Sequence, residues 1–267
     1  MSETTSPAVL VERKGHVLIA TINRPEARNA VNAAVHVGLG EALEQAENDP
    51  EVRVVILTGA GDQAFCAGAD LKALSRGERL TPEDKAQRAW GFAGVVQHPI
   101  SKPMIAAVNG FALGGGTELA LSCDLVVAAD HAQFGLPEVK RGIYAAAGGA
   151  FRIAQQLPIK VAMEMLLTGE PFSAQRAFEL GFANRVVPLD KLMETAIDLA
   201  NRIAVNAPLS VQASKRIAMG IAEGAIANDA AYWEANNREG RVVMQSQDAK
   251  EGPLAFAQKR QPVWQAK

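Results

Sequence analysis

The first part of the chain alternates two hydrophobic patterns, one typical of buried strands and one typical of amphipathic helices. A run of β-branched and apolar residues over Val17–Ile22 predicts a strand that Asn23-Arg24-Pro25 ends. Apolar positions then recur every three or four residues from Val35 to Ala46, which predicts a helix that ends at Asp49-Pro50. The continuous apolar run at 52–58 predicts a strand that is buried on both faces.

Strand and helix patterns go on alternating in the middle of the chain. Short apolar runs at 105–108 and Leu125–Ala129 predict two more buried strands, and 117–122 between them predicts a short helix. Repeated strand–helix units with buried strands indicate an α/β protein.

One further helix is predicted after Thr81. Thr81 has the side chain of an N-cap, and Pro82 is suited to the first helical position. We expect this helix to turn Trp90, Ala93 and Val96 toward the core.

From about Lys160 onward the pattern changes to one helix after another. Three of these helices are predicted at 173–181, with Ser173 as N-cap, at 191–205 and at 209–222. We therefore divide the chain into an α/β core at 1–200 and a helical region at 201–267.

Composition narrows the class of protein. The 267 residues are 48% apolar and 21% charged, which excludes a disordered chain or a coiled coil. The net charge of −2 comes with no basic block, so we expect no nucleic-acid partner. No apolar run is long enough to span a membrane, and no signal-peptide pattern precedes the first strand, so we expect a cytoplasmic protein.

Cysteine and histidine are too few and too scattered to suggest a metal site or a disulfide framework, and we expect neither. These residues are Cys66, Cys123, His16, His36, His98 and His131.

Two segments of small residues could bring backbone amides close to a ligand. The first is Phe65-Cys66-Ala67-Gly68-Ala69-Asp70-Leu71, which follows a buried strand. The second, Gly114-Gly115-Gly116, precedes an apolar helix and presents the positive end of the helix dipole to an anion or oxyanion. The first could equally be a tight loop. The second is neither a P-loop nor a dinucleotide fingerprint, because the required residues are missing.

Two glutamates accompany these segments. Glu118 lies one helical turn after Gly115 among apolar neighbours, so we expect a partly buried carboxyl with a raised pKa. Alternatively, Glu118 is a first-turn glutamate whose negative charge only interacts favourably with the positive end of the helix dipole. Glu138 lies in a turn begun by Pro137, and a surface ion pair with Lys140 or Arg141 is the alternative there. Together, free amides and two carboxylates suit an enzyme that forms an enolate.

The chain resembles the crotonase (enoyl-CoA hydratase/isomerase) superfamily in four motifs that stand in the family's order and spacing. The motifs are Asn23-Arg24-Pro25 with Asn29-Ala30, Phe65-Cys66-Ala67-Gly68-Ala69-Asp70-Leu71-Lys72, Gly110-Phe111-Ala112-Leu113-Gly114-Gly115-Gly116-Thr117-Glu118, and Phe134-Gly135-Leu136-Pro137-Glu138. The similarity extends through Glu251-Gly252-Pro253 to the 256–260 segment near the end. The resemblance implies a spiral of turned ββα units whose C-terminal helices build trimers, commonly paired into hexamers.

The resemblance also implies a ligand and a site. The ligand is a coenzyme A thioester, which is the substrate rather than a separate cofactor. The amides of Ala67 and Gly115 match the family's oxyanion hole. Glu118 matches the base that acts on water, and Glu138 matches the group that delivers a proton to C2. Residues that match the CoA groove are Ala27, Ala67, Gly68, Ala69, Asp70, Leu71 and Gly114, with Phe256 and Lys259 at the nucleotide end.

One loop departs from the family. Where the family usually has Gly-x-x-Pro-Gly-x-Gly-Gly, this chain has Gly142-Ile143-Tyr144-Ala145-Ala146-Ala147-Gly148-Gly149. We expect this change to affect acyl-chain preference more than catalysis. Tyr144 could enter the acyl pocket or pack outward, and we favour the outward orientation.

The leading interpretation is an enoyl-CoA hydratase that adds water across a C2–C3 double bond. Two alternatives remain. One is an isomerase, and the other is a carnitinyl-CoA (crotonobetainyl-CoA) dehydratase, because residues 251–264 resemble the tail of such enzymes. A non-catalytic acyl-CoA binding protein is disfavoured, because a binder gains nothing from burying two acids. A serine hydrolase lacks a nucleophile elbow here.

Overall fold

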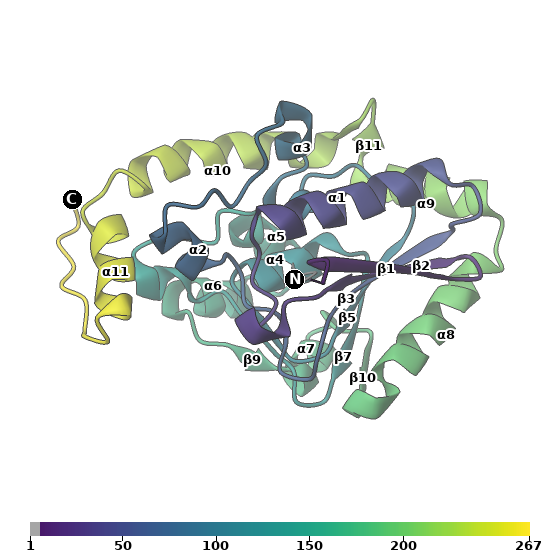
Figure 1. Cartoon of the computed structure of the whole chain (residues 1–267), viewed down its shortest axis with the longest axis horizontal. Coiled ribbons are helices and arrows are strands. Elements are labelled where there is room, and N and C mark those ends of the chain that lie inside the picture. Colours follow the sequence, from purple (N-terminus) through teal and green to yellow (C-terminus); the bar gives the residue numbers. More distant parts are fainter. Residues whose placement is uncertain (1–5) are drawn as a thin grey trace, which may run out of the picture.

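Two sheets form the centre of the molecule in the computed structural model, which describes residues 6–267 (Figure 1). The larger sheet has the strand order β1-β2-β3-β5-β7-β10, in which β1 and β2 form an antiparallel hairpin and all other neighbours are parallel. Its strands are β1 (Val9–Lys14), β2 (Val17–Ile22), β3 (Val54–Gly59), β5 (Met104–Val108), β7 (Leu125–Ala129) and β10 (Arg185–Val187).

The smaller sheet has the order β4-β6-β8-β9, with only β9 antiparallel to its neighbour. Its strands are β4 (Ala64–Cys66), β6 (Phe111–Leu113), β8 (Gln133–Gly135) and β9 (Phe172–Ser173). The chain passes from the larger sheet to the smaller one three times in succession, through β3–β4, β5–β6 and β7–β8. This repetition confirms the predicted α/β spiral of ββα units.

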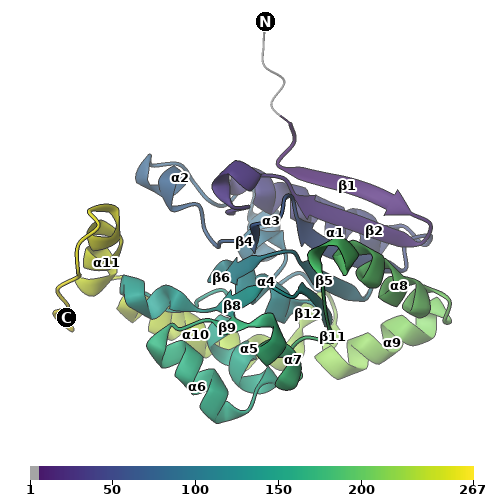
Figure 2. The same cartoon turned by 90° about the horizontal axis from the view of Figure 1, so that it is seen from below.

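Helices surround both sheets (Figures 1 and 2). They are α1 (Ala33–Asn48), α2 (Leu71–Ser75), α3 (Lys85–Ala89), α4 (Gly115–Ser122), α5 (Gly149–Gln156), α6 (Ile159–Thr168), α7 (Ala174–Glu179), α8 (Leu192–Ala204), α9 (Pro208–Met219), α10 (Ala230–Val243) and α11 (Asp248–Ala257). Short 3₁₀ turns lie at η1 (Pro25–Ala27), η2 (Phe92–Gly94), η3 (Pro137–Arg141), η4 (Leu189–Lys191) and η5 (Ala227–Asp229), and β11 (Ile221–Ala222) pairs with β12 (Ala225–Ile226).

The larger sheet is buried on both faces, which explains the unbroken apolar runs of its central strands. Val55 and Leu57 of β3 face the main core, which includes the inward side of α1. Val54 and Ile56 of the same strand face a second apolar cluster built with α8. Each of the central strands β2, β3 and β5 therefore contributes alternate residues to two different cores.

Helix α8 spans the boundary that the sequence predicts after residue 200. Ala196, Ala200 and Ala204 lie on one face of this helix and pack into the same cluster on the sheet. The boundary consequently falls inside a helix that belongs to the core.

The prediction of a helix from Thr81 is wrong. The helix there is the short α3, and its N-cap is Asp84, whose side chain accepts a hydrogen bond from the Gln87 amide. A carboxylate is at least as good an N-cap as a hydroxyl, so the cap moves one turn along the chain. Ala93 and Val96 are buried as expected, but they lie beyond this helix.

The hairpin strand β1 was not among the predicted elements. Its residues are mostly exposed, and after Val11 its sequence is charged, so it carries no continuous apolar signal. Its backbone is nevertheless paired with β2 along six residue pairs.

The turn η2 has an unusual backbone that is fixed by α1. Gly91, Ala93 and Gly94 all have positive φ, and for Ala93 this conformation is strained. A Cβ atom on Gly94 would lie 2.3 Å from the carbonyl oxygen of His36. The ring of Trp90 similarly occupies the space beside Gly40 and stacks on His98. Close packing on α1 therefore holds η2 in place.

Helix α11 packs directly on η3 in spite of the long separation in sequence. A Cβ atom on Gly252 would lie 1.9 Å from the carbonyl oxygen of Arg141, and one on Gly142 would lie 2.1 Å from that of Asp248. The side chain of Asp248 also accepts hydrogen bonds from the amides of Gln265 and Ala266, which folds the last residues back onto α11.

The C-terminal helices leave apolar side chains on the surface of the chain. Val205, Leu209 and Ile217 are each more than three-quarters exposed, and α9 has no buried residue. Exposed apolar surface of this kind is typical of interfaces, and assembly into a trimer or a pair of trimers stays a prediction. Within residues 6–267, no helix is both long enough and apolar enough to cross a membrane.

Replacing Gly94 by Ala should destabilise the fold through both the positive φ and the clash with α1. We expect Gly94→Ala to lower the free energy of unfolding by about 2–4 kcal/mol. Gly224→Ala is a matched control, because Gly224 has nearly the same φ and open space where the Cβ would lie. We expect it to cost about 1 kcal/mol. Urea unfolding measures both, and equal losses would contradict the packing role of Gly94.

Candidate active site

Three glycines allow other groups to reach the start of α4. A Cβ atom on Gly114 would lie 3.0 Å from Oε1 of Glu138, and one on Gly115 would lie 2.4 Å from the ring of Phe92. One on Gly116 would lie 1.9 Å from the carbonyl oxygen of Cys66. The first turn of α4 is therefore enclosed from three directions. The Gly115 amide is one of the helix N–H groups without a partner inside the helix.

Glu118 lies one turn into α4 and is buried, since the residue as a whole is only 4% exposed. Its Oε1 accepts a hydrogen bond of 2.9 Å from the amide of Gly149 at the start of α5. Burial, and then the nearby charge of Glu138, raise the pKa of Glu118 well above its usual range. This is the buried carboxyl with a raised pKa that the sequence predicts.

Glu138 lies in the first turn of η3 and points toward Gly114. Its Oε2 is buried and has no hydrogen-bond partner among the residues that the structure describes. Burial raises the pKa of Glu138 as well. The two neighbouring cations are engaged elsewhere, Lys140 with Glu170 and Arg141 over the ring of Phe256. The alternative of a surface ion pair is therefore wrong.

Two acids in one buried site cannot both ionise easily, because like charges repel strongly where water is excluded. A carboxyl group of such a pair therefore keeps its proton to a higher pH than an isolated glutamate does. Such a pair can accept a proton at one position and donate one at another.

The amide of Ala67 is already used, which corrects its predicted role as a free donor. It donates a hydrogen bond of 3.1 Å to the carbonyl oxygen of Arg28. Arg28 and Asn29 both have positive φ, and Asn29 is fully buried with its side chain bonded to Ala60 and Ala64. The Ala67 amide therefore helps to fix the 24–31 segment rather than a ligand.

The amide of Ala69, two residues after Ala67 in the same loop, has a different environment from the amide of Ala67. It forms an isolated parallel bridge with Val31, in which Val31 donates to the Gly68 carbonyl and accepts from the Asp70 amide. In such a bridge the N–H of the central residue points away from the partner strand. The Cβ position of Gly68 lies 3.2 Å from the Gly115 nitrogen, so this loop borders the start of α4.

Asp70 has a structural role, because its side chain links the turn at Arg24 to the start of α2. We call these contacts the Asp70 clamp. Its carboxylate accepts hydrogen bonds from Arg24 at 2.8 Å and from the Ala73 amide in α2 at 2.9 Å. Burial alone would raise the pKa of Asp70, but these hydrogen bonds outweigh it and the pKa is lowered. The clamp joins the turn that carries Ala27 to the loop before α2, while Leu71 is exposed at the start of that helix.

The predicted nucleotide-end residues lie on or just after α11. Phe256 is exposed on one side, and the Arg141 guanidinium lies 4.1 Å from its ring centre. Lys259 follows the helix and is exposed. Figures 1 and 2 place α11 and α2 on the same side of the molecule.

The side chain of Tyr144 packs against α10. It is half-buried, and its hydroxyl donates a hydrogen bond to the Asn236 carbonyl on α10. The amide group of Asn236 donates in turn to the Ala146 carbonyl. The loop that departs from the family is thus tied to α10.

Two residues at the site were missed by the sequence analysis. Phe92 packs against Gly115, and Arg152 lies in α5 with its guanidinium buried. The glycines around Phe92 were a usable signal, since Gly-Phe-Ala-Gly indicates a tight turn. Arg152 gave no local signal.

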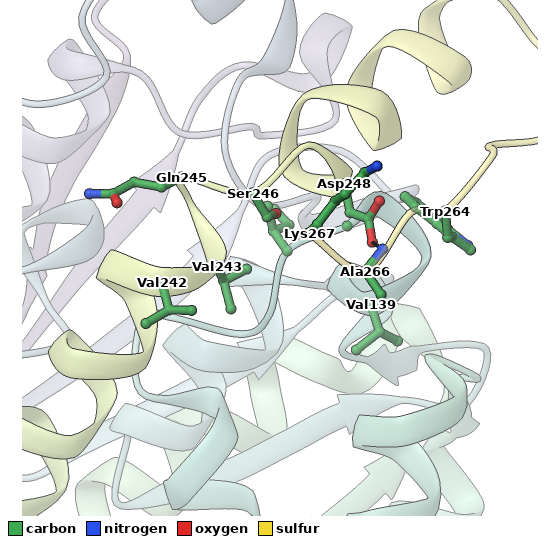
Figure 3. Close-up of a pocket in the computed structure, with 11 residues that line it drawn as sticks. Val139, Val242, Val243, Gln245, Ser246, Asp248, Trp264, Ala266 and Lys267 are labelled. Atoms are coloured by element: carbon green, nitrogen blue, oxygen red, sulfur yellow. Dashed lines mark hydrogen bonds between the residues drawn. The ribbon is translucent and has the colours of Figure 1, made fainter.

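A separate cavity of about 610 Å³ lies between the end of η3 and the C-terminal tail (Figure 3). Val139, Ile143, Val242 and Trp264 make much of its lining apolar, and none of the predicted site residues lines it. Over the described residues 6–267, no three His, Cys, Asp or Glu side chains gather as a metal site would require.

Comparison with known proteins identifies the family of this chain. Residues 12–267 match the model of the family described as enoyl-CoA hydratase/isomerase. A protein of Proteus mirabilis (strain HI4320) named carnitinyl-CoA dehydratase is 42% identical over 268 residues, which cover 98% of this chain and 100% of that protein. A protein of Salmonella typhi with the same name is 42% identical over 264 residues, covering 98% and 100%.

Solved structures give the same result. The crystal structure of carnitinyl-CoA hydratase from Mycobacterium avium is 59% identical, with a TM-score of 0.95 over 98% of this chain and 100% of that one. The enoyl-CoA hydratase from Mycobacterium tuberculosis H37Rv is 44% identical, with a TM-score of 0.75 over the same shares. The chain therefore belongs to the enoyl-CoA hydratase/isomerase family, the crotonases.

Proposed function

We propose that this protein is a hydro-lyase that adds water to, or removes it from, the C2–C3 bond of a coenzyme A thioester. The observation that carries the proposal is the pair Glu118 and Glu138, two buried acids with raised pKa values beside the enclosed start of α4. An acyl-CoA binding protein would gain nothing from the cost of burying them.

In the direction of hydration, the ionised form of Glu118 takes a proton from water while the oxygen of that water bonds to C3. The electrons of the double bond move toward the thioester oxygen as an enolate forms. Glu138 then delivers a proton to C2 and the thioester carbonyl is restored. Dehydration is the same sequence reversed, in which Glu138 takes the proton from C2 and Glu118 gives a proton to the hydroxyl group that leaves C3.

The enolate oxygen needs hydrogen-bond donors while it carries charge. We assign this role to the amides of Gly115 and Ala69, in place of Gly115 and Ala67. The Gly115 amide lies at the positive end of α4, and the Ala69 N–H points away from its strand partner. Both are main-chain groups that closely packed glycines hold in place.

A carnitinyl-CoA type of thioester is our second, more specific candidate for the substrate. The support is that the relatives at 42% identity and the structure with a TM-score of 0.95 carry that name, whereas the structure named enoyl-CoA hydratase has a TM-score of 0.75. A simple 2-enoyl-CoA is the general candidate. An isomerase needs only one carboxylate, so two buried glutamates favour hydration.

Turnover with a panel of thioesters tests the function. We expect the purified protein to hydrate 2-enoyl-CoA esters and crotonobetainyl-CoA, with the larger kcat/KM for crotonobetainyl-CoA. Loss of the enoyl absorbance gives the rate, and mass spectrometry identifies the product. Tight binding of every ester without conversion would favour the binding protein, and migration of the double bond without water uptake would favour the isomerase.

Exchanging either acid for its amide tests the mechanism. Glu118→Gln and Glu138→Gln keep the side-chain shape but remove a proton-transfer group, so each should lower kcat by roughly 10²–10⁴-fold. Binding of a saturated acyl-CoA, measured by calorimetry, should change little. Glu170→Gln is the matched control, because Glu170 is an exposed partner of Lys140 and should leave kcat unchanged. Wild-type rates in both catalytic variants would refute the two-acid mechanism.

Adding one methyl group to Gly115 tests the oxyanion donor. The methyl group of Gly115→Ala would overlap the ring of Phe92, so the amide or the ring must move. We expect a loss of about 10²-fold in kcat/KM. The double variant Gly115→Ala/Phe92→Ala makes room for the methyl group and should recover much of that loss. A folded Gly115→Ala protein with the wild-type rate would rule out this amide as a donor.

A further inference from the structure

Arg152 is a buried cation that joins three elements of the site. Its Nη2 and Nε contact Oδ2 of Asp229, at the end of η5, at 2.7 and 3.2 Å. Its Nη1 donates a hydrogen bond of 2.7 Å to the hydroxyl of Ser122 in α4. The guanidinium carbon also lies 5.6 Å from the ring centres of Phe151 and Trp233. Arg152 and Asp229 are both more than nine-tenths buried.

These contacts lead to Glu118 by two routes. The hydroxyl of Ser122, which accepts from Arg152, donates a hydrogen bond of 2.7 Å to the backbone carbonyl of Glu118. Gly149, whose amide binds the Glu118 carboxyl, begins the same helix α5 that carries Arg152. The position of α5 against α4 and α10 therefore decides where the Glu118 carboxyl lies.

Arg152 also acts on Glu118 through its charge. The ionisable groups that influence Glu118 or are influenced by it are Glu138 on η3, Arg152 on α5, Cys66 at the end of β4 and Tyr144 in the loop before α5. Burial raises the pKa of Cys66 to about 12 and raises that of Tyr144, so both stay neutral near pH 7. Burial and then Glu138 raise the pKa of Glu118, while hydrogen bonds from the backbone of Gly149 and Ala147, and after them the charge of Arg152, lower it.

We propose that Arg152 and Asp229 are a positioning pair that orients Glu118 and sets how readily it gives up its proton. The proposal rests on the proposed function of Glu118 as the group that exchanges a proton with water. Asp229 partly cancels the charge of Arg152, so the two members act on Glu118 in opposite directions. If the pair had a purely structural role, removing either member would not shift the protonation of Glu118 in opposite directions.

The pH dependence of kcat/KM tests this opposition. Asp229→Asn leaves the charge of Arg152 uncancelled, so the limb of the profile that reports Glu118 should move to lower pH by about half a pH unit or more. Arg152→Met removes the cation, and the same limb should move to higher pH. Arg152→Lys keeps the charge but loses the two-pronged contact, so kcat should fall while the limb stays near its wild-type position.

Controls keep this test decisive if a variant is poorly folded. Lys215→Met breaks a partly exposed ion pair, that of Lys215 with Asp124 at 2.7 Å, and should lower stability without moving the limb. The double variant Arg152→Met/Asp229→Asn leaves no unpaired buried charge, so it should fold even where Arg152→Met does not. Shifts of Asp229→Asn and Arg152→Met in the same direction, or no shift of either, would overturn the proposal.

A measurement without substrate separates this proposal from the proposed function. The fold favours the neutral form of Glu118, so its contribution to stability is complete below the ordinary glutamate pKa of about 4.3. That contribution is lost as the pH rises through the raised pKa of the folded state. The loss measured by urea unfolding across this range should be smaller in Asp229→Asn and larger in Arg152→Met.

The same unfolding series in a Glu118→Gln background should remove the part of these differences that depends on Glu118. If the differences depend on Glu118 but no thioester is turned over, the pair acts as proposed and the proposed function fails. If thioesters are hydrated but the differences persist without Glu118, the proposed function stands and the role of the pair is refuted.

Discussion

Close backbone packing at the start of α4 is the constraint on which the site depends. None of Gly114, Gly115 and Gly116 could carry a methyl group without displacing a neighbour, and each neighbour belongs to a different part of the chain. The turn with Glu138, the ring of Phe92 and the end of β4 all meet there. An exposed helix start can bind any anion, whereas one enclosed in this way can hold a single oxygen at a defined place and keep water from competing for it.

The burial of two acids beside this turn has a cost that the rest of the fold offsets. A buried carboxyl needs hydrogen bonds, and Glu118 receives one from the first amide of α5. One oxygen of Glu138 has no such partner. Unpaired buried groups of this kind are rare in native proteins and are typical of functional sites. The site is thus least stable where its chemistry is expected to occur.

Most of the fold could be predicted from the sequence, because its buried strands carry unbroken apolar runs. The strand Leu125–Ala129 agrees at both ends, and α1 agrees to within two residues. The carboxyl of Glu118 was found because three glycines precede it. The sequence could not tell the amide of Ala67 from that of Ala69, since their availability depends on pairing with Arg28 and Val31 in a distant segment. Arg152 could not be found either, because its partners come from α4 and η5.

The contact between α11 and η3 has a consequence for how the protein is made. The turn that carries Glu138 is supported by backbone contacts from Gly252 and Asp248, which the ribosome adds long after Glu138 itself. Both sheets are complete before that point, because the last strand of the larger one ends at Val187. During synthesis, both sheets can therefore form while the turn that carries Glu138 still lacks its outer support. We therefore expect a chain that ends before α11 to resist proteolysis while the turn that carries Glu138 remains unsupported.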